Sequence, residues 1–177
     1  MATDKDRAML GLSFAATGFI AEARALFDGL PMATRRSKEA IELESFLAMR
    51  DGDPARASSL MRRALAQDPG SQSAQLKLAM LDLDCIFPEI QRQAAASLIK
   101  IARDGSQLST IAAQHLAGHP AIQKKEAEEL LQIAPHLPEG GHPVRLAALC
   151  ACIRFNPQTR EALLDRETRG AGDLNPE

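Results

Sequence analysis

The sequence contains no tryptophan and no tyrosine, and its aromatic content is 3%, made up of six phenylalanines. β-Strands favour aromatic and β-branched side chains, whereas this chain is rich in Ala, Leu, Glu, Arg and Gln, which are strong helix formers. The composition therefore excludes a predominantly β fold. It predicts an all-α protein with more than roughly 60% helix and no strand.

Cysteine and long apolar runs are also scarce. The three cysteines, Cys85, Cys150 and Cys152, are an odd number that does not suggest a disulfide framework. We expect all three to be reduced, which favours the cytoplasm. No window approaches the ~18 apolar residues of a membrane span, and the charged first seven residues lack a signal-peptide core. A chain that had lost its signal sequence would instead belong in the periplasm.

No charge of one sign dominates. The chain has 21 basic and 23 acidic residues, for a formal net charge of −2. Such a balance provides no general attraction for nucleic acid or an anionic membrane. The few aromatic side chains also leave little surface on which bases could stack. We therefore expect neither a nucleic-acid partner nor a membrane-spanning segment.

Catalytic and metal-binding signatures are missing as well. His115 and His119 have a spacing that suits a metal on one helix face, but Gly118 and Pro120 interrupt that helix, so we expect capping or surface roles. Cys150 and Cys152 lack the spacing of paired zinc ligands. Residues 138–143 form a predicted linker without the lysine of a phosphate-binding loop. We therefore expect no enzyme activity, cofactor or metal. A metal-dependent enzyme using these His and Cys side chains is the least favoured alternative.

The chain does have regularly spaced Gly and Pro breaks, which separate segments of about 11–17 residues, the length of ordinary helices. About ten helices are predicted in this way. Within them the apolar residues have helical spacing, as in Ala57, Leu60, Met61, Ala64 and Leu65. Asp53 followed by Pro54 is typical of a helix start.

Two stretches share one longer pattern. Residues Leu10, Gly11, Phe14, Gly18, Ala23 and Phe27 and residues Gly52, Ala57, Met61, Ala64 and Pro69 fit one frame with a period of about 34 residues. In this pattern the chain resembles the tetratricopeptide-repeat family. The resemblance implies a right-handed α-solenoid of about five antiparallel helix pairs. It places one repeat domain over residues 1–169, with units starting near residues 4, 38, 72, 106 and 143 and the weakest match between residues 105 and 142. A polar last helix over residues 158–169 would cap the array, and residues 170–177 would form a disordered tail.

The frame also predicts packing. Small side chains should let neighbouring helices approach closely at Gly11, Ser45, Ala79, Ala113 and Cys150. Ala57 and Ala64 should be buried against the first helix of their own unit or of the next.

In this family, partners bind in a concave groove lined by the first helix of each pair. Carried onto this sequence, the frame assigns the groove to Leu12, Glu42, Phe46, Met49, Arg50, Leu76, Met80, Leu83 and Asp84. Apolar residues occupy the positions of the family's carboxylate clamp, so we expect an adaptable apolar groove, with Phe46, Met49 and Met80 at least partly exposed.

The resemblance implies a scaffold or adaptor that binds a protein or peptide. The alternative is a bacterial secretion or assembly chaperone that shields an apolar client segment. Nothing in the sequence indicates homo-oligomerisation.

Overall fold

The computed structural model describes residues 3–138, 141–159 and 161. Of these, 78% are helical and none lies in a strand, so the all-α prediction is confirmed. The described chain contains nine α-helices: α1 (Asp4–Ala16), α2 (Ile20–Asp28), α3 (Lys38–Arg50), α4 (Pro54–Gln67), α5 (Gln72–Leu83), α6 (Pro88–Arg103), α7 (Ser109–Gly118), α8 (Lys124–Ile133) and α9 (Gly141–Phe155). Three short 3₁₀ helices accompany them: η1 (Thr34–Arg36), η2 (Ala134–His136) and η3 (Pro157–Thr159).

Helices α1, α3 and α5 each begin at the residue where the repeat frame predicted from the sequence starts one of its first three units. Side chains in front of these helices explain the boundaries, because Thr3, Ser37 and Ser71 each accept a hydrogen bond from a backbone N–H in the first turn. Asp53 caps α4 in the same way, ahead of Pro54. Later units are displaced: α7 begins at Ser109 and α9 at Gly141. His142 and Pro143 therefore belong to the first turn of α9, not to a linker.

The chain divides into two compact units, Met1–Ala94 and Ala95–Glu177, which are described separately. A single repeat domain over residues 1–169 stays a prediction. The predicted last helix and tail lie largely or wholly outside the described residues.

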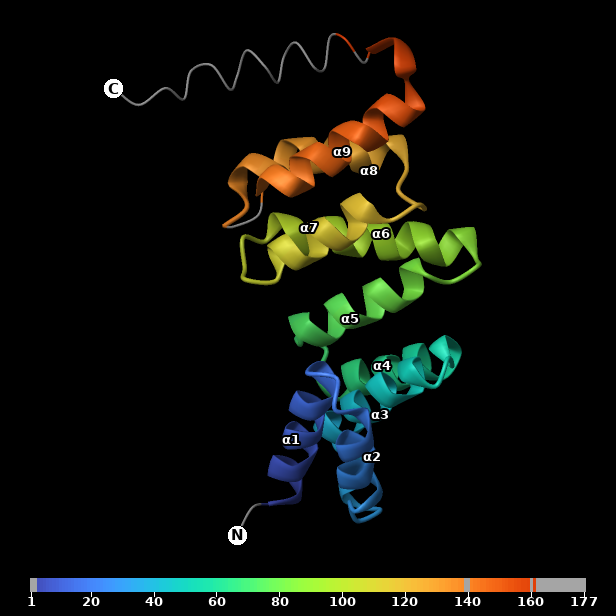
Figure 1. Cartoon of the computed structure of the whole chain (residues 1–177), viewed down its shortest axis with the longest axis vertical. Helices are drawn as coiled ribbons and strands as arrows, with labels where there is room; N and C mark the ends of the chain where they lie inside the picture. The colour runs from blue at the N-terminus through green and yellow to red at the C-terminus, as the bar shows by residue number, and fades with distance from the viewer. Residues whose placement is uncertain (1–2, 139–140, 160, 162–177) are drawn as a thin grey trace, which may run out of the picture. The chain divides into compact units, whose positions relative to one another are not determined.

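In the first unit, α1 packs on α2 and α3, and α4 packs on α3 and α5 (Figure 1). Gly11 marks the closest approach, because a Cβ atom there would lie 2.5 Å from Cδ2 of Leu43. Ser45 of α3 is buried and donates a hydrogen bond of 3.0 Å to the carbonyl of Ala57. Ala57 and Ala64 are fully buried in a cluster with residues of α3, and Leu81 of α5 packs against that cluster. The prediction for these two alanines is confirmed.

In the second unit, α9 packs on both α7 and α8 (Figure 1). Ser109 repeats the arrangement of Ser45: it is fully buried and donates to the carbonyl of Ile101 at 3.0 Å. Arg103, at the end of α6, forms an ion pair of 2.9 Å with Glu129 of α8. A Cβ atom at Gly141 would lie 2.3 Å from the carbonyl oxygen of Ala134, so only glycine fits where α9 begins.

Not all positions predicted to carry small, closely packed side chains are buried. Ala79 and Ala113 are buried, as expected, but Cys150 is exposed and its predicted burial is wrong. Helix α9 buries Val144, Ala148, Ala151 and Cys152. Position 150 is two residues from Ala148 and Cys152, roughly 200° around the helix, and therefore lies on the opposite side.

No helix in the described part of the chain is both long enough and apolar enough to cross a membrane.

Candidate partner-binding surface

Two ion pairs connect the first helices of successive pairs in the first unit. Lys5 Nζ of α1 lies 3.0 Å from Glu39 Oε1 of α3, and Lys77 Nζ of α5 lies 2.6 Å from Glu42 Oε2 of α3. The Glu42 side chain is only 10% exposed, so this predicted groove residue already has its charge satisfied within the fold. The pairs therefore connect α1 to α3 and α3 to α5.

The carboxylate of Glu39 stays charged although it is partly covered. Burial opposes its ionisation, but hydrogen bonds from its own backbone N–H and from Lys5 outweigh that effect and hold the pKa of Glu39 below its ordinary value. The Lys5–Glu39 ion pair therefore connects the first turns of α1 and α3 at their exposed side.

The apolar part of the face lies where α1 meets α3. Leu12 and Phe46 are half-buried and pack against the same core cluster, which includes Leu43. The guanidinium of Arg50 lies 5.4 Å from the centre of the Phe46 ring, a cation–π distance. Met49 is 38% exposed. The structure thus brings Phe46 and Arg50 together, packs Leu12 against the same core cluster as Phe46, and leaves the Met49 side chain partly open to solvent.

On α5 the predicted residues divide into two groups. Met80 is half-buried and Asp84 is exposed, so both present surface. Leu76 and Leu83 are buried, with exposed fractions of 5% and 0%, and belong to the core. Helix α5 packs on α4, and Gln91 in the first turns of α6 donates to the carbonyl of Leu83, so α5 is covered on more than one side. Binding of a partner by the remaining seven residues stays a prediction.

Two histidines and two cysteines were the other candidate site residues in the sequence. The rings of His115 and His119 lie 6.0 Å apart, and Nδ1 of His119 accepts a hydrogen bond from the backbone N–H of Ala121 at 3.1 Å, within the turn that follows α7. Cys152 is buried, and this burial raises the pKa of its thiol. Among the described residues, no three His, Cys, Asp or Glu side chains are grouped closely enough to hold a metal ion.

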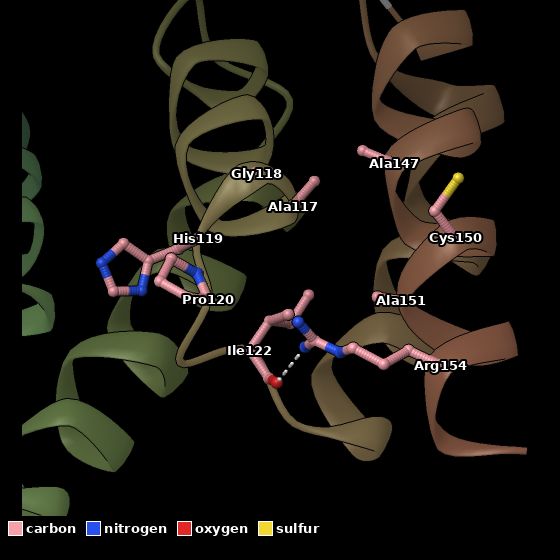
Figure 2. A pocket seen from close by; sticks show the side chains of 9 residues that line it. All are labelled: Ala117, Gly118, His119, Pro120, Ile122, Ala147, Cys150, Ala151 and Arg154. Carbon is pink, nitrogen blue, oxygen red and sulfur yellow. Dashed lines mark hydrogen bonds between the residues drawn. The ribbon is translucent and has the colours of Figure 1, made fainter.

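The structure adds a hollow in the second unit that the sequence did not predict (Figure 2). It has a volume of about 390 Å³ and lies between the end of α7 and the exposed side of α9. Ala117 stands on the α7 side and Ala147 and Ala151 on the α9 side, while Arg154 extends from α9 and donates to the carbonyl of Ile122 at 3.2 Å. Small residues gathered at positions 117–118 and 147–151 were the only signal in the sequence.

No family model, curated protein or solved structure matches the chain.

Proposed function

We propose that the chain is a protein-interaction scaffold or adaptor of the tetratricopeptide-repeat type, a right-handed α-solenoid whose first unit binds a partner segment across α1, α3 and α5. One observation carries the proposal. Phe46, Met49 and Met80 come from neighbouring first helices joined by an ion pair, and all three keep part of their apolar surface exposed. Apolar side chains exposed on adjacent elements are typical of a protein-binding surface.

The chemistry of the surface indicates what kind of segment it would bind. Met side chains adapt to different apolar shapes, and Phe46 with Arg50 stacked on its ring provides an aromatic anchor. Arg50 and Asp84 are exposed at the C-terminal ends of α3 and α5, with opposite charges. An apolar helix or extended peptide with polar flanks fits this surface. The reduced thiols of the chain itself suit a cytoplasmic location.

The test begins with the immobilised full chain and a matched pair of variants. Met49→Glu places a charge on the proposed surface, whereas Met32→Glu places the same charge on a residue that is 73% exposed outside α1, α3 and α5. Mass spectrometry should identify a protein that the unmodified chain and Met32→Glu capture and Met49→Glu does not. Equal capture by both variants would contradict the proposal. A partner recovered in a fixed ratio and insoluble alone would favour the chaperone alternative.

Methionine methyl signals then locate the contact. The chain has six Met residues, of which Met49 and Met80 lie on the proposed surface, Met61 is buried and Met32 lies elsewhere. Titration with the binding segment of the captured protein should shift the Met49 and Met80 methyl signals and leave that of Met32 unchanged. Shifts confined to Met32 or Met9 would place the partner site elsewhere.

A further inference from the structure

The turn between α5 and α6 exposes two large apolar side chains. Ile86 is 85% exposed and Phe87 is 60% exposed, and they are adjacent in the chain. We call these two residues the apolar tip. Single exposed apolar residues need no explanation, but two bulky ones together on a protruding turn resemble the anchors that dominate protein interfaces.

Backbone hydrogen bonds border the apolar tip on both sides. The carbonyl of Phe87 accepts the backbone N–H of Gln91 at 3.1 Å, which starts α6, and Pro88 follows as the first residue of that helix. On the other side, the N–H of Cys85 donates to the carbonyl of Asp82 at 3.3 Å. A tip that is already ordered loses little conformational entropy when it binds.

The size and the lining of the hollow in the second unit suit a bulky apolar group such as the tip. Its volume of about 390 Å³ is at the lower end of the ~300–1,000 Å³ range of binding pockets. Three alanines and Gly118 are among its nine lining residues, so small side chains leave room there for a bulky apolar group (Figure 2). The space therefore suits one or two large apolar side chains.

The charges around the two features are opposite. Asp84 and Glu89 are exposed on either side of the apolar tip, and Arg92 forms an ion pair with Glu89 on the same helix. Arg154 is exposed at the hollow. Because Arg92 balances the charge of Glu89, the attraction that would orient the tip as it enters is that between Asp84 and Arg154.

We propose that the apolar tip of one copy of this chain docks into the hollow of a second copy. The tip belongs to the first unit and the hollow to the second, so every copy carries both halves of the contact. Such a contact is heterologous: it joins copies head to tail and leaves a free tip and a free hollow at the ends of each chain of copies, unless a ring closes. Association then grows with protein concentration and weakens in high salt.

The first experiment is a disulfide cross-link in the full chain. Ile86→Cys places a thiol on the tip while Phe87 remains, Cys85→Ser removes the neighbouring thiol, and the native Cys150 is the exposed acceptor at the hollow. With oxidised glutathione as electron acceptor, we expect reducible dimers and larger species on a denaturing gel. Met32→Cys in the same background is the matched control, because that position is equally open but lies at neither feature, and it should yield none. A cross-link within one chain, or none, would overturn the proposal.

The second experiment tests whether the contact is heterologous. Phe87→Ser removes the tip, and Ala147→Phe fills the hollow from a position that is only partly buried. Each variant alone should sediment as a monomer at concentrations where the unmodified chain associates, with association weakened at least about tenfold. Mixed together, they should form a one-to-one dimer and nothing larger, because one intact tip and one intact hollow remain. Monomers in the mixture, or an unmodified chain that stays monomeric at every concentration, would contradict the proposal.

Discussion

At the scale of the residue, small side chains decide where the helices meet. Gly11 admits Leu43 of the neighbouring helix, and Ser45 and Ser109 each place a hydroxyl against a carbonyl of the adjacent helix. A buried hydroxyl is costly unless it is hydrogen-bonded. Both serines therefore combine close approach with a satisfied polar group, once in each unit.

Ala57 provides a direct test of this packing. It is fully buried against α3 in a cluster with Ile41 and Ala48. Ala57→Leu should overpack that junction and lower the free energy of unfolding by about 1–3 kcal/mol. Lys125→Ala, at a side chain that is 83% exposed, should change it by less than about 0.5 kcal/mol. Urea denaturation of both variants measures the difference, and equal effects would show that position 57 is not a packing site.

At the scale of the element, ion pairs fix how helices are aligned. Nζ of Lys38, at the start of α3, lies 2.6 Å from Oδ2 of Asp68, which follows α4. The hydrogen bond from Lys38 holds the pKa of Asp68 below its ordinary value, and the same bond raises the pKa of Lys38. A carboxyl group whose pKa is lower in the folded state stabilises the fold above its unfolded pKa. That contribution is lost as the pH falls through the folded value.

The pair therefore predicts a pH-dependent difference between the unmodified chain and Asp68→Asn. At neutral pH the variant should melt at a lower temperature, because the charged pair is gone. As the pH falls below the ordinary pKa of an aspartate, about 4, the two melting temperatures should converge, since Asp68 becomes protonated in the unmodified chain. Lys38→Met should show the same convergence. Thermal melts followed by circular dichroism measure it, and equal melting temperatures of the unmodified chain and Asp68→Asn at neutral pH would mean that the pair does not contribute.

Element boundaries were predicted best where their causes are local. Ser37 and Asp53 lie next to the helices they cap, so the starts of α3 and α4 can be predicted from neighbouring residues alone. The orientation of α9 depends instead on α7 and α8, which lie elsewhere in the sequence. The frame therefore placed Cys150 on the wrong side of its helix. The start of α9 was missed for a related reason, because Gly141 suggested a loop but is required by its contact with Ala134.

At the scale of the whole molecule, surfaces could be predicted only in part. The frame correctly placed Phe46, Met49 and Met80 at partly exposed positions, because exposure follows the helical period. It could not show that Leu76 and Leu83 are covered, since that depends on how α5 is enclosed. The hollow was missed for the same reason, because it exists only once separate helices are assembled. Ile86 and Phe87 of the apolar tip are adjacent in the sequence, but the apolar pattern alone did not show that both are exposed.

The division between the two compact units falls inside helix α6, between Ala94 and Ala95. An unbroken helix transmits order along its backbone hydrogen bonds, and stacked repeats unfold together when neighbours are well coupled. We therefore expect the unmodified chain to show one calorimetric transition. Ala96→Pro, at an exposed position within α6, removes a helical hydrogen bond and should cost about 3 kcal/mol or more. It should also separate the unfolding of the two units into two transitions. Ala96→Ser keeps the hydrogen bond and should retain one transition with a shift of less than about 1 kcal/mol. If Ala96→Pro merely moves a single transition to lower temperature, the units are coupled by something other than the continuity of α6.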